Sequence, residues 1–588
     1  MSVFSHLITL LLLLAIGSLA HAQRVTELMV YHYSGQTFLA WESVGTSVKE
    51  YTVYRSRRPL RTSLALRQAE EQFVVQPGTA INRRLSSSLQ RPAYFRLPGP
   101  SGTLDFSREY FVVTTTETRK YYYAITATGE NGEFRQVRPG KNATASAVLE
   151  RVAMPSPIHQ GRFSYLSRSV DVFVHWASDR DIPGYPAMCN LPSYPFNFAV
   201  QKNGKAESHP LVVRMHGRGD HFLNHSNSLD NPQEYVLALD DELPGTVATS
   251  FWFGYDRGFD INRRGGLQPA PGTGVVDYTM RRVRWTLDWV LRKMPIDRSR
   301  VYLTGISMGG SGVAFSLFQF GDEIAAALAV IPRLEYSYND SLETPYGRSA
   351  QRLFPALWGN ADRSPRMAAG GAVYDQLSFS EKLRSSDLRN FPPLRVISGK
   401  KDSVVGWRQA VAGMREADSL KTGAEFLWDD RGHDAHGNHP WSLQKSLIDL
   451  SRYRGDRSWP AFSSVSANPN PEQISPGSWN ASVTWYEPVI DESDRWSVGI
   501  RRAALEMRDN IYEAGGALTS DITPRRLQRF AIRRGLWYGW AIFTNRAEAA
   551  SGRIRALRDG ELTIPDVPIP ALPSRLEIHS IPGPIFDR

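Results

Sequence analysis

The stretch VYLTGISMGGSG, residues 301–312, places a serine between glycines directly after an apolar strand. Residues 301–303 predict the end of a buried strand, and residues 312–318 predict a helix packed on a sheet. The turn between them has the pattern G-x-S-x-G, with Gly305 and Gly309 on either side of Ser307. A sharp strand-to-helix turn strains the backbone of its central residue, and only glycine-sized neighbours tolerate the crowding. The pattern therefore predicts that the Ser307 hydroxyl is held up at the edge of a sheet.

Apolar strands alternate with helices on both sides of this turn, from residue 153 to residue 455. A helix is predicted over residues 277–294, because its apolar residues recur on one helical face. The candidate strands are residues 170–177, 209–217, 250–256, 300–307, 325–332, 392–399 and 424–430. Alternation of this kind predicts an α/β fold with a mostly parallel sheet covered on both faces.

A serine hydroxyl becomes a nucleophile when a histidine takes its proton and a carboxylate orients that histidine. Asp402 lies in the polar loop after the strand at 392–399, and His433 lies in the loop after the strand at 424–430. Both follow Ser307 in the order acid, then histidine. Both also lie beyond the carboxyl ends of strands, where ligands bind in open α/β sheets. We expect Ser307, Asp402 and His433 to act together.

Acyl transfer also needs donors for the oxyanion that develops on the carbonyl oxygen. The strand at 209–217 ends in His216 and Gly217, followed by Arg218. This glycine-flanked turn predicts that the backbone N–H of Arg218 points into the same cleft. The second donor is predicted to be the N–H of Met308, the residue after the nucleophile.

Other residues compete for the same roles. We prefer His433 to the later histidines because it comes soonest after the strand; these are His436 and His439. No carboxylate cluster or cysteine set completes a coordination sphere, so neither a metal nor a cofactor is expected. The aspartates that compete with Asp402 lie in or beside the histidine's own strand and loop; these are Asp429, Asp430 and Asp434.

Residues 160–455 resemble the α/β-hydrolase superfamily, among esterases similar to polyhydroxybutyrate depolymerases and feruloyl or acetylxylan esterases. The resemblance rests on residues 212–220 (VVRMHGRGD), on residues 294–300 (MPIDRSR) and on the serine turn. It implies a carboxylic-ester hydrolase that forms an acyl-enzyme, with Ser307, Asp402 and His433 as its triad. The chain departs from the family in its Arg218 and in unmatched β-regions at both ends.

Two other functions remain open. The same triad order occurs in prolyl-oligopeptidase-like serine peptidases, although the N-terminal region is too short for their propeller. The chain is alternatively a non-catalytic adhesion or glycan-binding protein with a degenerate hydrolase core.

The two ends of the chain have the alternating pattern of β-strands. Residues 35–43, 50–60 and 120–133 resemble strands of a fibronectin type III domain, and three segments after residue 479 predict further strands. The expected domains are a β-sandwich at 23–152, the catalytic domain at 153–455 and a β-rich domain at 456–588. The stretch at 464–478, rich in proline and asparagine, is predicted to be a linker.

Residues 1–22 have the apolar run and small-x-small ending of a secretory signal peptide, with cleavage predicted before Gln23. The segment lacks a basic head, so an uncleaved anchor stays open. We expect a secreted or periplasmic protein without stable membrane insertion. Cys189 is the one cysteine of the chain, which excludes an intramolecular disulfide.

The 588-residue chain has a net charge of +10, and residues 525–535 are its densest basic stretch. Such a charge attracts anionic polymers or an anionic cell surface. No recognition motif accompanies it, so a nucleic-acid partner is not expected. The expected partner is an ester substrate, attached to a polysaccharide or part of a polyester.

Overall fold

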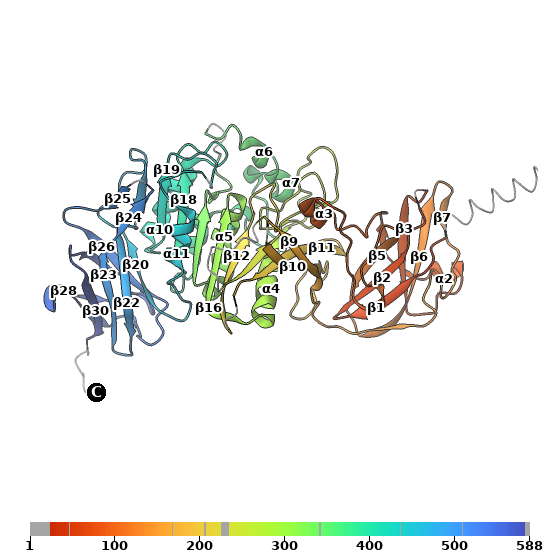
Figure 1. Cartoon of the computed structure of the whole chain (residues 1–588), viewed down its shortest axis with the longest axis horizontal. Coiled ribbons are helices and arrows are strands. Elements are labelled where there is room, and N and C mark those ends of the chain that lie inside the picture. Colours follow the sequence, from red (N-terminus) through yellow and green to blue (C-terminus); the bar gives the residue numbers. More distant parts are fainter. Residues whose placement is uncertain are drawn as a thin grey trace, which may run out of the picture. The chain divides into compact units, whose positions relative to one another are not determined.

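The computed structural model describes residues 24–581, apart from residues 46, 167, 205–206, 225–233, 340–342, 436 and 509. The chain divides into two compact units, one up to Phe198 and one from Ala199 onward (Figure 1). The predicted signal peptide lies outside the described residues. Within the described ranges, no helix has the length and apolar character needed to cross a membrane.

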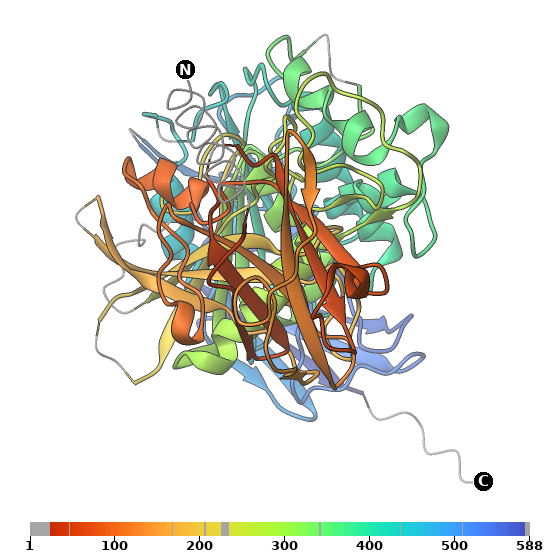
Figure 2. The same cartoon turned by 90° about the vertical axis from the view of Figure 1, so that its right-hand side faces the viewer.

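Two antiparallel sheets form most of the first unit (Figure 2). One contains β1 (Met29–Tyr33), β2 (Gln36–Glu42) and β5 (Arg108–Thr114). The other contains β3 (Glu50–Ser56), β4 (Glu70–Val75), β6 (Arg119–Gly129), β7 (Gly132–Phe134) and β8 (Val148–Glu150). Alternate residues of both sheets share one core, in which the Trp41 and Tyr51 rings lie 5.4 Å apart. The predicted β-rich region is confirmed, while its assignment to fibronectin type III stays a prediction.

The remaining elements of this unit are short helices and a hairpin. The helices are α2 (Ser63–Leu66), α3 (Arg83–Leu89) and η1 (Gly99–Ser101). The hairpin pairs β9 (Ile158–Tyr165) with β10 (Arg168–Ala177). Strand β11 (Tyr194–Lys202) then leads into the second unit.

The second unit contains a mostly parallel sheet in the order β13-β12-β16-β17-β18-β19-β21. The strands are β12 (His209–Met215), β13 (Tyr235–Leu239), β16 (Ile296–Ile306), β17 (Ala326–Val330), β18 (Leu394–Gly399), β19 (Glu425–Asp429) and β21 (Gly477–Trp479). Only the β19–β21 pair within this series is antiparallel. The predicted α/β class with a largely parallel sheet is confirmed.

Helices connect these strands (Figure 1). The longer ones are α4 (Tyr278–Lys293), α5 (Met308–Phe320), α10 (Trp407–Ser419) and α11 (Leu443–Leu450). The shorter ones are η2 (Gly321–Glu323), α6 (Arg348–Gln351), α7 (Phe354–Trp358), η3 (Ala361–Arg363), α8 (Val373–Gln376) and α9 (Phe379–Ser385). Helix α4 matches the predicted helix and buries its apolar face.

The register of the parallel strands brings their carboxyl ends to one edge. Met215 of β12 pairs with Gly305 of β16, and Ile306 pairs with Val330 of β17. Further along the sheet, Gly399 of β18 pairs with Asp429 of β19. The loops that leave these strands therefore emerge side by side, and they carry the residues singled out in the sequence.

The prediction of a strand at residues 250–256 is wrong. Only β14 (Tyr255–Asp256) is extended there, and it pairs with β15 (Val275–Val276) outside the large sheet. Phe251 and Trp252 instead have positive φ angles of 54° and 60°. The strand β13, which the sequence analysis did not identify, takes the place beside β12.

The C-terminal β-region belongs to the same unit. Its strands are β20 (Trp459–Ser463), β22 (Val483–Asp491), β23 (Arg495–Arg502), β24 (Ala504–Met507), β25 (Asn510–Glu513), β26 (Thr519–Arg525), β27 (Trp537–Thr544), β28 (Ala547–Arg555), β29 (Ile564–Pro568) and β30 (Ser574–Ser580). One apolar core joins this region to the large sheet, because Tyr302 and Leu427 cluster with Trp496. The predicted linker at 464–478 ends inside β21, which pairs with β19.

The basic stretch at 525–535 is only partly a surface. Arg525 and Arg526 are 1% and 3% exposed. Arg525 donates to the carbonyls of Leu388 and Lys421, and Arg526 donates to those of Gly321 and Asn390. Burial lowers the pKa of both guanidinium groups to about 10, so both remain charged at neutral pH. These two arginines tie the C-terminal β-region to the α/β part of the unit.

We expect Arg525→Met to destabilise the second unit by about 3 kcal/mol, because it leaves two partly buried carbonyls without donors and removes a buried side chain that they hold. Differential scanning calorimetry should show a lower melting temperature for the transition of this unit. Arg529→Met is the matched control, since Arg529 is exposed. Equal melting temperatures for the two variants would contradict a stabilising role for the buried arginine.

Candidate active site

Ser307 lies in a strained turn between β16 and α5. Its φ and ψ angles are 57° and −119°, and its N–H donates to the carbonyl of Val330 over 2.8 Å. The turn fits only because its neighbours lack side chains. A Cβ on Gly309 would overlap the carbonyl of Met215, and a Cβ on Gly305 would lie 3.0 Å from the amide nitrogen of Gly310.

The structure brings together the three residues expected to act as a unit. The Oγ of Ser307 lies 2.8 Å from Nε2 of His433. The other ring nitrogen, Nδ1, lies 2.8 Å from a carboxylate oxygen of Asp402. The second oxygen of Asp402 accepts from the N–H groups of Val404 and Val405. The Asp402 side chain is 2% exposed and that of His433 is 24% exposed, so the carboxylate is shielded from solvent while the imidazole is partly accessible.

A cavity of about 180 Å³ opens beside this hydrogen-bonded chain. Its lining residues come from loops at the carboxyl edge of the sheet and from the segment around α7; they are Arg218, Phe251, Ser307, Met308, Ser311, Arg333, Tyr336, Tyr346, Phe354, Val404, Val405 and His433. Both predicted oxyanion residues, Arg218 and Met308, are among them. Met308 is the first residue of α5, so its N–H has no carbonyl within the helix to bond.

Hydrogen bonds of the buried His216 fix the loop that follows β12. The Nδ1 of His216 lies 2.8 Å from the carbonyl oxygen of Gly217, and its Nε2 lies 3.0 Å from the amide nitrogen of Asp241 and from a carboxylate oxygen of Asp240. The indole N–H of Trp252 donates to the carbonyl of His216. His216 is 2% exposed. It therefore orients the turn that carries Arg218 and does not reach the cavity.

Asp241 organises the loop that the sequence analysis took for a strand. Its buried carboxylate accepts from Thr249 Oγ1, from both the N–H and the hydroxyl of Ser250, and from the N–H of Trp252. These bonds stabilise the positive φ angles at Phe251 and Trp252. Phe251 then lines the cavity, while Trp252 packs behind the serine turn, where a Cβ on Gly312 would lie 2.7 Å from it. No sequence motif marked Asp241.

The competing residues have other partners. Asp429 pairs with Arg431, Asp430 pairs with Lys401, and Asp434 lies 3.1 Å from His439. His436 lies outside the described residues. Among those that the structure describes, no group of histidine, cysteine and carboxylate side chains is placed to hold a metal ion.

Aromatic rings form one wall of the cavity. Phe251 and Tyr336 each lie 5.1 Å from Phe354, and burial raises the pKa of Tyr336 to about 12, so its hydroxyl stays protonated at neutral pH. From the sequence alone, five other aromatic residues are candidates to line a cleft, and none of them is singled out as a binding residue: Phe222, Trp252, Trp358, Trp407 and Trp441. None of these five lines the cavity, and all except Trp407 are buried.

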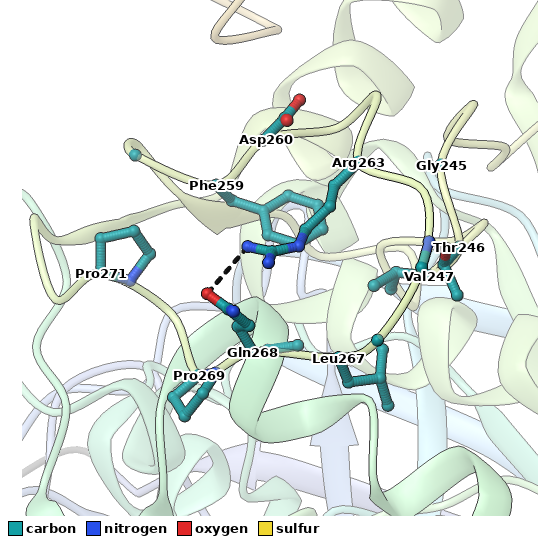
Figure 3. A pocket seen from close by; sticks show the side chains of 14 residues that line it. Gly245, Thr246, Val247, Phe259, Asp260, Arg263, Leu267, Gln268, Pro269 and Pro271 are labelled. Carbon is teal, nitrogen blue, oxygen red and sulfur yellow. Dashed lines mark hydrogen bonds between the residues drawn. The ribbon is translucent and has the colours of Figure 1, made fainter.

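A smaller pocket of about 120 Å³ lies between residues 245–247 and the loop at 258–271 (Figure 3). Ala356 of α7 also lines it. Most of its lining comes from the loop at 258–271, which contributes glycine and proline residues together with Phe259, Asp260, Arg263 and Leu267. Across it, Arg263 donates to the amide oxygen of Gln268 over 3.0 Å. No serine or histidine is among the residues that line this pocket.

No protein-family model matches the sequence, and no curated protein matches it. Among solved structures, an acetyl xylan esterase from Paenibacillus sp. R4 is 17% identical over 51% of this chain and 88% of its own, with a TM-score of 0.34. An S-formylglutathione hydrolase from Agrobacterium tumefaciens is 15% identical over 50% and 99%, with a TM-score of 0.32. A protein assigned as a dipeptidyl aminopeptidase IV from Bacteroides ovatus ATCC 8483 is 10% identical over 72% and 56%, with a TM-score of 0.36. Because these scores are low, we infer the function from the geometry of the site.

We expect Gly309→Ala to destabilise the second unit by roughly 3 kcal/mol, because its Cβ would overlap the Met215 carbonyl and push α5 away from β12. Calorimetry measures the loss of stability. Gly515→Ala is the matched control, since a Cβ there meets nothing within 4 Å. A Gly309→Ala protein with unchanged melting temperature would contradict the close approach of helix and strand at this turn.

Proposed function

We propose that this protein is a serine hydrolase that cleaves carboxylic esters through an acyl-enzyme. The observation that carries the proposal is the continuous hydrogen-bonded chain from Ser307 through His433 to Asp402 at the wall of a cavity. Its order along the sequence and its place at the carboxyl edge of a parallel sheet support the same assignment.

In the proposed reaction, Ser307 Oγ attacks the ester carbonyl while Nε2 of His433 takes the hydroxyl proton. Asp402 holds the ring by Nδ1 and stabilises the imidazolium that forms. The N–H groups of Met308 and Arg218 hold the negative oxygen of the tetrahedral intermediate. The intermediate collapses, and His433 gives its proton to the departing alcohol. Water then attacks the acyl-enzyme with His433 again as base, which releases the acid and restores Ser307.

The shape of the cavity supports a small apolar or aromatic acyl group. Phe251, Phe354, Val404 and Val405 supply apolar surface around Ser307. An acyl group seated there would be shielded from water while the alcohol side of the ester faces the exposed Tyr346. An ester attached to hemicellulose or to a polyester fits an exported enzyme with a fibronectin type III-like module at 23–152, a catalytic domain at 153–455 and a β-rich domain at 456–588. The proposal that the enzyme is exported rests on the signal peptide expected at residues 1–22.

Ser307→Ala should lower the hydrolysis of p-nitrophenyl acetate by roughly a thousandfold or more, because it removes the nucleophile. The same substitution should abolish labelling by a fluorophosphonate probe. Ser311→Ala is the matched control: this serine lines the same cavity but its hydroxyl bonds the backbone. Labelling that persists in Ser307→Ala and disappears in Ser311→Ala would overturn the assignment. A wild-type protein that cleaves peptides but no ester would be a peptidase of the prolyl-oligopeptidase type.

Asp402→Asn should lower kcat by about a thousandfold to ten-thousandfold, because an amide favours the wrong tautomer of His433. Asp434→Asn tests the nearest competing carboxylate and should leave kcat within about twofold, since Asp434 contacts His439 and lies half exposed. The two variants are compared on the same p-nitrophenyl ester. If Asp434→Asn lowers kcat more than Asp402→Asn does, the proposed assignment of Asp402 as the triad acid is wrong.

A further inference from the structure

The first unit contains a cavity of about 400 Å³ that no step of the proposed hydrolysis uses. It lies where β3 ends, β6 begins and the chain turns through α2. Its lining residues are Arg55, Ser56, Arg57, Arg58, Pro59, Ala65, Gln68, Glu70 and Tyr121. All of them belong to the β-rich N-terminal region, so the cavity is a property of that region alone.

Positive charge dominates the lining. Three arginines face one carboxylate, that of Glu70. Arg57 shares Glu117 with Arg119, at 2.9 and 3.2 Å. Arg58 is exposed, and within the described part of the chain its guanidinium takes part in no ion pair. The cavity therefore offers an anion at least one guanidinium group that no internal carboxylate neutralises.

Arg55 forms the fixed base of the cavity. Its side chain is 4% exposed and pairs with the fully buried carboxylate of Glu150. Its guanidinium carbon lies 3.4 Å from the centre of the Tyr121 ring, and its Nε has no hydrogen-bond partner among the described residues. A side chain held on both sides in this way is already ordered, so binding to it requires little further loss of conformational freedom.

The remaining lining groups are hydrogen-bonding groups rather than cations. Ser56, Gln68 and Glu70, with hydroxyl, amide and carboxylate side chains, also line the cavity, and the Ser56 hydroxyl accepts from the N–H of Arg58. A carboxylate repels a phosphate chain, but it accepts hydrogen bonds from hydroxyl groups. Planar guanidinium groups match a carboxylate in a bidentate geometry. The lining thus suits a ligand that combines an anion with several hydroxyl donors.

We propose that this cavity binds an acidic carbohydrate, a polysaccharide of uronic acid units. Arg57 and Arg58 bind the sugar carboxylate, while Glu70 and Gln68 bind ring hydroxyls. The volume of the cavity suits one or two such units of a longer polymer. This binding function does not depend on the chemistry proposed for Ser307.

The test is isothermal titration of the full chain with polygalacturonate, using dextran as the uncharged comparison. The wild-type protein should bind the first polymer and not the second. Arg57→Gln with Arg58→Gln should weaken binding roughly tenfold, as two guanidinium contacts are lost. Arg533→Gln with Arg534→Gln is the matched control. It removes the same charge from two consecutive exposed arginines that do not line this cavity. Equal affinities of the two double variants, or no binding by the wild-type protein, would overturn the proposal.

Glu70→Ala distinguishes a sugar site from a general anion site. It should weaken binding of polygalacturonate by loss of the hydroxyl acceptor, although the net positive charge of the cavity rises. An anion site would respond in the opposite sense. If Glu70→Ala instead strengthens binding of polygalacturonate, double-stranded DNA and phosphatidylserine vesicles alike, the cavity attracts any polyanion and the carbohydrate assignment is wrong. Melting temperatures of all variants establish that each is folded.

Discussion

The left-handed backbone at Ser307 is the constraint on which the rest of the site depends. A non-glycine residue at φ 57° and ψ −119° is strained by about 1–3 kcal/mol. The strain persists because β16 ends and α5 begins on either side of one residue, with both elements fixed by their neighbours. The Ser307 N–H bonds the end of β17, and Gly309 lies against the end of β12. Three strands of the sheet thus determine where one hydroxyl points.

The same edge of the sheet explains how distant segments meet. Asp402 and His433 each follow a parallel strand, and parallel strands in register end at a common level. Each loop then needs only local bonds to orient its side chain. The N–H groups of Val404 and Val405 fix the Asp402 carboxylate, and that carboxylate fixes the His433 ring. Under the proposed mechanism, groups ordered in this way beforehand need little reorganisation during the reaction.

The parts of the site that follow strand ends could be predicted from the sequence. Ser307, Asp402 and His433 each come directly after an apolar run. Such runs can be recognised along the sequence as the strands of an α/β sheet, so the loops that follow them can be located as well. Residues 250–256 could not be predicted, because an apolar run does not distinguish a strand from a buried turn. The carboxylate of Asp241 decides between them by bonding four groups of that loop. Contacts of this kind depend on the tertiary structure and leave no local pattern.

The sequence does not show which arginines present their charge at the surface. Some arginines hold internal carbonyls, while others are exposed and free to attract an anion. Arg525 ends β26, and its buried guanidinium donates to the carbonyls of Leu388 and Lys421 in the α/β part of the same unit. Removing the guanidinium would leave those carbonyls without hydrogen-bond donors. Because its donors are used inside the protein, the charge of Arg525 is not available to a partner. Arg58 follows the end of β3, is exposed and forms no ion pair within the described part of the chain, so its charge remains at the surface. The net charge of +10 therefore overstates the charge presented to an anionic polymer, and the location of the exposed arginines decides what can bind.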